Sequence, residues 1–174
     1  RLAALTGDTI YLSVRDGDEA LCVDRCTGSF PIRTLTLDIG DRRPLGVGAG
    51  SLALLAFQDE ADVTRVLETG AVARRDFKGF STAELSPMIQ ETQRSGYAVN
   101  DGRIVSAMMA IGVPVHDDGG RVLAALSIAA IRERMDGGRI DELAAALARE
   151  ASDLGRILSR RHSTPATKVP ELQT

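Results

Sequence analysis

This 174-residue sequence has no long apolar run, no visible secretory leader and no excess of basic residues. No apolar run approaches the roughly 18 residues that a membrane-spanning helix needs, so we expect no membrane contact and a cytoplasmic location. The formal net charge is −3, whereas a chain that grips nucleic-acid phosphates by itself needs a basic footprint. These absences exclude a membrane protein and disfavour direct DNA binding by this chain.

Cysteine and histidine are scarce, with only Cys22, Cys26, His116 and His162. If residues 22–26 form a strand, the two cysteines share one face with their Cα atoms roughly 13 Å apart, at ~3.3 Å per residue. A disulfide needs about 4.4–6.8 Å. Two free thiols fit a reducing cytosol, and no further ligand stands at metal-binding spacing. We therefore expect no disulfide, no metal site and no cofactor.

A catalytic set is also missing. The sequence has no defensible Ser-His-acid arrangement, no pair of carboxylates on one element and no thiol with a histidine nearby. Nucleophilic catalysis needs such a base beside the nucleophile. The sequence therefore disfavours an enzyme.

Hydrophobic periodicity gives the fold class. Alternating residues predict strands over residues 9–14, 20–25, 33–39, 97–100, 104–115 and 121–130. Helical spacing predicts one helix that follows the glycine loop and ends near residue 57. It predicts three more over residues 58–70, residues 81–94 and the stretch after residue 138. The order β-β-β-α-α-α-β-β-β-α predicts one α+β domain over residues 1–162, with an antiparallel sheet and helices packed on it. Residues 163–174 have no periodicity, and we expect a disordered tail.

The central feature is a glycine-rich loop over residues 43–57 that runs into an apolar helix. Gly46, Gly48 and Gly50 permit positive-φ turns and close approach of a ligand, and Ser51 is a plausible N-cap. Such a helix start suits an anion, although the glycines could equally serve only close helix–sheet packing. The loop is neither a Walker A motif nor a dinucleotide fingerprint.

A second feature is a strand face of small residues. Asp118-Gly119 predicts a two-residue hairpin turn. In this register three pairs of residues lie opposite each other, with all six side chains on one face: Ala110–Ser127, Met108–Ala129 and Gly112–Ala125. This face either receives a closely packed helix or leaves room for a ligand. Ser127 and Asn100 could then offer polar contacts.

A third feature is the cluster of Arg74, Arg75 and Lys78. It could hold an anion, or it could be a solvated connection between helices. We favour the solvated connection.

Short segments spread over residues 1–160 form a recognisable pattern. They are residues 2–12, 23–25, 39–45, 53–56, 96–100, 113–115 and 120–128, and they include Ile-Gly-Asp-Arg-Arg-Pro-Leu, Gly-Tyr-Ala-Val-Asn and Gly-Arg-Val-Leu-Ala-Ala-Leu-Ser-Ile. In this order and spacing they resemble the effector-binding domain of the IclR family of bacterial transcription regulators.

The resemblance implies a GAF-like fold with a small-molecule site between the sheet and the glycine loop. The implied ligand-binding positions are Gly48, Ala49, Gly50, Ser51, Asn100, Met108, Ala110, Ser127 and Ala129. It also implies assembly as a homodimer or homotetramer, and DNA binding only through an N-terminal winged helix-turn-helix that is absent from these residues. Many members have polar or basic residues where this chain has Leu52, Ala110 and Ala129, so a more apolar pocket is implied here.

Three hypotheses follow. The leading one is a ligand-sensing module of a transcription regulator, which binds a small organic acid or a similar effector and performs no catalysis. The second is a small enzyme that uses the Gly48–Ser51 loop to hold a phosphate or acyl group. The third is an oligomerisation module with no ligand.

Overall fold

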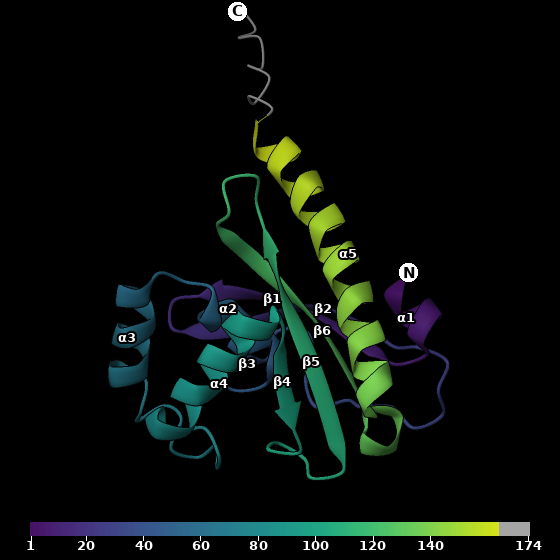
Figure 1. Ribbon diagram of the computed structural model, residues 1–174, viewed down its shortest axis with the longest axis horizontal. Helices are drawn as coiled ribbons and strands as arrows, with labels where there is room; N and C mark the ends of the chain where they lie inside the picture. The colour runs from purple at the N-terminus through teal and green to yellow at the C-terminus, as the bar shows by residue number, and fades with distance from the viewer. Residues whose placement is uncertain (164–174) are drawn as a thin grey trace, which may run out of the picture.

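The strand-forming segments assemble into a six-stranded antiparallel sheet in a computed structural model, which describes residues 1–163. The strands are β1 (Thr9–Asp16), β2 (Glu19–Cys26), β3 (Arg42–Pro44), β4 (Ala98–Asp101), β5 (Met108–His116) and β6 (Val122–Ile131). Their order across the sheet is β3-β2-β1-β6-β5-β4 (Figure 1). The predicted α+β class is therefore confirmed.

Helices cover both faces of this sheet. They are α1 (Leu2–Thr6), α2 (Ala49–Ala56), α3 (Glu60–Thr69), α4 (Thr82–Ser95), the 3₁₀ turn η1 (Arg132–Arg134) and α5 (Gly137–Ser163). The long α5 packs on β5 and β6 from one side, and α2 packs on β1, β5 and β6 from the other, with α4 against α2 (Figure 1). Helix α1 had no counterpart in the predicted order.

The two helical layers have different sequence patterns because they have different surroundings. The predicted stripe of α5 is confirmed, with Leu143, Leu147 and Ala151 buried against the sheet. All eight residues of α2 are buried, as expected for a helix that is apolar all round and lies between two layers. Helix α2 is therefore the inner helix of the domain.

Local capping chemistry fixes the ends of α3 and α4. Asp59 caps α3 by accepting a hydrogen bond from the backbone N–H of Asp62. Helix α4 begins with a capping box, since Ser81 and Glu84 bond reciprocally, and Gly96 ends the helix at a left-handed φ of 82°. These caps satisfy end groups that a helix cannot satisfy internally.

The strand predicted over residues 33–39 is wrong. Residues 31–41, here called the covering segment, have no regular structure, and β3 pairs with β2 in their place. Side chains satisfy the carbonyls of the segment: Tyr11 donates to Thr34, and Arg25 donates to Leu37 at 2.8 Å. Because its carbonyls have these partners, the segment does not need a neighbouring strand.

The predicted hairpin register between β5 and β6 is wrong by two residues. Ala110 lies opposite Ala129 and Gly112 opposite Ser127. Gly120, at a left-handed φ of 83°, adds a third residue to the loop and so shifts the register by one residue. A bulge beside Val115 shifts it by one residue more. A shift of two keeps every side chain on its predicted face.

The two cysteines lie on opposite faces of the sheet, contrary to the one-face prediction. Leu12 pairs with Asp24 and Ser13 pairs with Cys22, so Val23 is an extra residue in β2. This bulge reverses the alternation between the cysteines. Cys22 is buried, Cys26 is exposed, and both are free, as expected.

One of the two arginines in the cluster at residues 74–78 is buried rather than solvated. Arg74 is only 2% exposed, and its guanidinium donates to the carbonyls of Val66 and Leu67 at the end of α3. A cation at a helix C-terminus satisfies free carbonyls and complements the dipole. The prediction of a purely solvated connection was wrong for this residue.

The remaining differences concern element ends and absences. Strand β5 begins at Met108 rather than at residue 104, and α5 continues through Ser163. The rest of the predicted tail lies outside the described residues. Among residues 1–163, no helix has the length and apolarity to cross a bilayer, and no three His, Cys, Asp or Glu side chains gather as a metal site would require.

Candidate ligand-binding cavity

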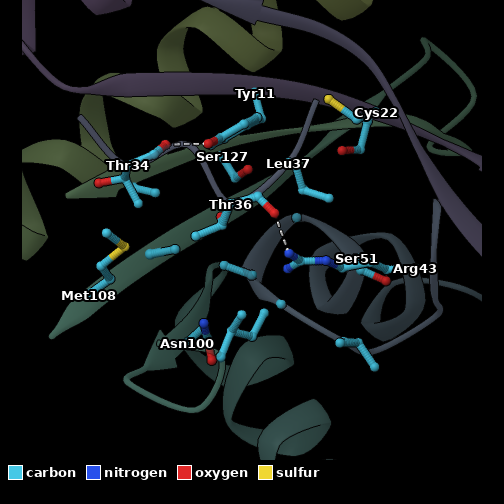
Figure 2. A pocket seen from close by; sticks show the side chains of 18 of the residues that line it. Tyr11, Cys22, Thr34, Thr36, Leu37, Arg43, Ser51, Asn100, Met108 and Ser127 are labelled. Carbon is cyan, nitrogen blue, oxygen red and sulfur yellow. Dashed lines mark hydrogen bonds between the residues drawn. The ribbon is translucent and has the colours of Figure 1, made fainter. Parts of the chain in front are cut away.

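A cavity lies between the inner sheet face, the glycine loop and the covering segment (Figure 2). All nine residues predicted for the site line it: Gly48, Ala49, Gly50, Ser51, Asn100, Met108, Ala110, Ser127 and Ala129. The free volume of this cavity, counted as the space open to the centre of a water-sized sphere, is about 50 Å³. One water needs about 10–15 Å³ on this measure, so the free space suits a compact ligand.

The small-residue face is shared between a helix and the cavity. A Cβ atom on Gly112 would lie 2.5 Å from the Ala49 carbonyl oxygen, and one on Gly50 would lie 3.1 Å from Ser127 Oγ. The first turn of α2 therefore packs directly on this part of the face. Ala110 and Ala129 lie beyond the contact and line the open space. Both alternatives left open by the sequence apply, each to one part of the face.

Ser51 shapes the loop instead of capping the helix. The N-cap is Gly48, at a left-handed φ of 89°. The Ser51 hydroxyl accepts from the Gly46 N–H and donates to the Pro44 carbonyl, both at 3.0 Å. The N-cap prediction for Ser51 was wrong because two positive-φ glycines turn the chain earlier.

Arg43 is a cavity residue that sequence reasoning missed. It is the only charged side chain among the described residues lining the cavity. Its Nη2 donates to the Thr36 carbonyl at 2.6 Å, and it has no ion-pair partner among the described residues. Burial lowers the pKa of its guanidinium. The sequence feature that could have indicated its role is its position directly before Pro44, at the start of the glycine loop.

Two buried polar atoms of the cavity wall have no hydrogen-bond partner. They are Oδ1 of Asn100, on β4, and Oγ1 of Thr34, in the covering segment. The two residues are 7% and 2% exposed. Such atoms cost stability unless something bonds them. Thr34 was missed because residues 33–39 were predicted to form a strand rather than a segment over a cavity.

Tyr11 anchors the covering segment over the cavity. Its hydroxyl donates to the Thr34 carbonyl (Figure 2). Burial raises the pKa of Tyr11 and of the neighbouring Cys22 thiol. Both groups therefore stay protonated near neutral pH. A protonated thiol is not a nucleophile, so the cavity offers binding groups but no activated nucleophile among its described residues.

The fold and cavity together define a class: an α+β domain with a cavity between its sheet and a glycine loop. A model of the family described as bacterial transcriptional regulator IclR C-terminal matches residues 1–156. The chain therefore belongs to the IclR family of transcription regulators, as its C-terminal effector-binding domain. Its relatives are regulators of transcription and not enzymes.

Similarity to the sequences of known regulators supports this family assignment. The HTH-type transcriptional regulator KdgR of Escherichia coli K12 is 30% identical over 147 residues, which cover 84% of this chain and 56% of KdgR. The HTH-type transcriptional repressor AllR of Salmonella typhi is 30% identical over 139 residues, which cover 78% of this chain and 50% of AllR. The chain spans about half the length of these curated relatives.

Solved structures show the same fold. The crystal structure of the Thermotoga maritima IclR superposes with a TM-score of 0.82 at 24% identity, over 91% of this chain and 64% of that one. The C-terminal domain of E. coli KdgR gives a TM-score of 0.74 at 27% identity, over 89% and 90% of the two chains.

Proposed function

We propose that this domain binds a small-molecule effector in the cavity between the sheet and the glycine loop. The observation that carries the proposal is the cavity wall itself. It combines one cation, Arg43, with two buried polar atoms, on Asn100 and Thr34. None of the three has an ion-pair or side-chain hydrogen-bond partner among the described residues, and Asn100 and Thr34 are each more than nine-tenths buried. These groups cost free energy in the empty protein, and a bound polar ligand would recover it.

Ligand binding would act on DNA through the rest of the regulator. The relatives are HTH-type proteins, and the matched part of this chain covers 56% of KdgR and 50% of AllR. A ligand can shift such a protein only through its different affinity for two arrangements of domains or subunits. We propose a cytoplasmic homodimer or homotetramer, an effector that is a small organic acid or a similar compound, and DNA contact through an N-terminal winged helix-turn-helix.

The two rival hypotheses are weaker. An enzyme using the Gly48–Ser51 loop would need a base or nucleophile, and the described cavity lining has no histidine and only a protonated thiol at Cys22. A module serving only oligomerisation would have no reason to keep unpartnered polar atoms around an enclosed space.

A thermal-shift screen with small organic acids tests the proposal. A ligand at 100 times its Kd stabilises the folded state by about 2.7 kcal/mol, which raises Tm by roughly 5–11 °C for a domain of this size. Ala110→Leu would fill the cavity and abolish the shift. Ser127→Leu is a poorer choice, because Ser127 touches α2 at Gly50.

Ala145→Leu, on the exposed side of α5, is the matched control and should keep the full shift. An unchanged shift in Ala110→Leu would place the ligand elsewhere and contradict the proposed site.

A further inference from the structure

The charges around the cavity select the charge of the ligand. Arg43 brings one positive charge to the wall, and the described lining contains no Asp or Glu. One negative group on the ligand would therefore be compensated, a second would not, and an ammonium group would face a cation with no carboxylate in the described lining. This pattern favours a monoanion over a dianion, an amino acid or a neutral compound.

The free donors of Arg43 converge with the start of α2. Only Nη2 is engaged, with the Thr36 carbonyl. The other terminal nitrogen, Nη1, would lie 3.4 Å from a Cβ atom at Gly48, which is the N-cap of α2. A carboxylate at this corner would meet the guanidinium and the positive end of the helix dipole together. A glycine at position 48 leaves the space that this arrangement needs.

The unpartnered polar atoms select a second group on the ligand. A hydroxyl group both donates and accepts. It can therefore form a hydrogen bond with the hydroxyl of Thr34, whose Oγ1 has no partner among the described residues. In Figure 2, Thr34 and Met108 lie on the opposite side of the cavity from Arg43. The hydroxyl would thus lie at a distance from the carboxylate, with the apolar body of the ligand against Ala110 and Ala129.

We propose that the effector is a compact hydroxy-monocarboxylate, held by its carboxylate at Arg43 and by its hydroxyl at Thr34, across the cavity. This inference rests on the proposed function, because it assigns a ligand class to the same cavity. It makes Arg43 the residue that determines acid specificity, and it makes the covering segment part of the binding site.

Calorimetric titration with matched compounds tests the ligand class. Two suitable series are lactate with propionate, lactamide, alanine and malonate, and 3-hydroxybutyrate with butyrate, 3-hydroxybutyramide and 3-aminobutyrate. We expect one hydroxy acid or both to bind about ten- to a hundredfold more tightly than the corresponding amide and amino acid, which is the usual value of a charge-assisted hydrogen bond.

Variants assign the two ends of the ligand. Arg43→Gln should remove the preference for acid over amide, and Arg43→Lys should restore part of it. Thr34→Val should reduce the preference for the hydroxy acid over its deoxy analogue. The control is Arg42→Gln: Arg42 is adjacent in β3 but points to the surface pairs with Asp16 and Glu19, so both preferences should be retained.

Two results would overturn the ligand class without removing the site. One is equal binding of acid and amide that Ala110→Leu abolishes, and the other is no binding of any hydroxy acid while a neutral compound binds in the cavity. Binding of a hydroxy acid that Ala110→Leu and Arg43→Gln leave unchanged would contradict the proposed function as well, since the ligand would then lie outside the cavity.

Discussion

The two faces of the same sheet are built from different kinds of residue. Toward α5, Ile111, Val113 and Ile128 are at most 2% exposed and form a continuous aliphatic core. Toward α2, the neighbouring positions of β5 are Ala110 and Gly112, and buried polar groups accompany them. Because side chains alternate along a strand, one strand supplies a stabilising face and a binding face.

This division places the polar groups that cost stability on the cavity face. The described atoms without hydrogen-bond partners belong to Thr34, Asn100 and Arg74, and the first two line the cavity. The α5 face has no such atom among the described residues. Departures from ordinary folding rules are expected to gather at functional sites, so the contrast between the faces is itself an argument for the site.

The largest expected effect lies on the α5 face. Leu147 is 1% exposed in that core, and Leu147→Ala should lower the free energy of unfolding by about 3 kcal/mol through lost burial and a residual void. Ligand affinity should be unchanged, because α5 does not line the cavity. Urea denaturation and calorimetric titration measure the two quantities. Leu5→Ala, at a 72% exposed position, is the control with little effect. A large loss of affinity in Leu147→Ala would break the division between the faces.

The next effect lies where α2 meets the sheet. Gly112→Ala places a Cβ atom 2.5 Å from the Ala49 carbonyl oxygen and 2.9 Å from the Gly50 nitrogen. Both neighbours are backbone, so α2 must move, and we expect a loss of about 2 kcal/mol together with weaker ligand binding. Gly137→Ala, with no atom within 4 Å of its Cβ position, should be close to wild type in the same urea titration. Equal stability of the two variants would contradict the close contact.

A pH-dependent effect lies at the margin of the cavity face, where Arg15 of β1 holds Asp62 of α3. Hydrogen bonds from Arg15 lower the pKa of Asp62 from 3.8 to about 2. A carboxyl group with a lowered pKa stabilises the folded state above its unfolded pKa, and this stability is lost as pH falls toward the folded pKa. Asp62→Asn should therefore cost about 1 kcal/mol at neutral pH.

That difference between wild type and Asp62→Asn should shrink as pH falls from about 4 to about 2, measured by urea denaturation at each pH. Asp76→Asn, at an exposed carboxylate with no ion pair among the described residues, supplies the control. A difference that is constant with pH would show that the pair with Arg15 does not contribute.

The smallest expected effect has the opposite sign. Thr34→Val replaces a buried, unpartnered hydroxyl with a methyl group of similar shape, and should raise the stability of the ligand-free protein by about 1 kcal/mol. Thr82→Val is the matched control. The Thr82 hydroxyl donates to the Leu67 carbonyl at 2.9 Å, so this variant should lose stability. If both variants lose stability alike, Thr34 has a structural partner and the contrast between the faces weakens.

Much of the fold was predictable because it depends on local rules. The alternation of β1, the stripe of α5 and the capping box at Ser81 each show one structural period or motif in adjacent residues. All nine predicted site residues line the cavity. For the four on the β5–β6 hairpin, this holds because a register shift of two residues preserves the face of every side chain.

What was not predictable depends on contacts between distant residues. The covering segment alternates like a strand, but Tyr11 and Arg43 satisfy its carbonyls from other elements. Arg43 itself looks like an ordinary loop residue until the fold places it against Thr36. The bulge at Val23 leaves no signal in β2 that could be read without the partner strand.

The most direct test of the account is an NMR titration of methyl groups with a hydroxy acid, such as lactate or 3-hydroxybutyrate. The account predicts that the methyl signals of Met108, Ala110 and Ala129, on the cavity face, shift in proportion to bound ligand. It predicts that those of Leu143 and Leu147, on the α5 face, stay in place. Shifts confined to the α5 face, or an absence of shifts at all three cavity residues, would contradict it.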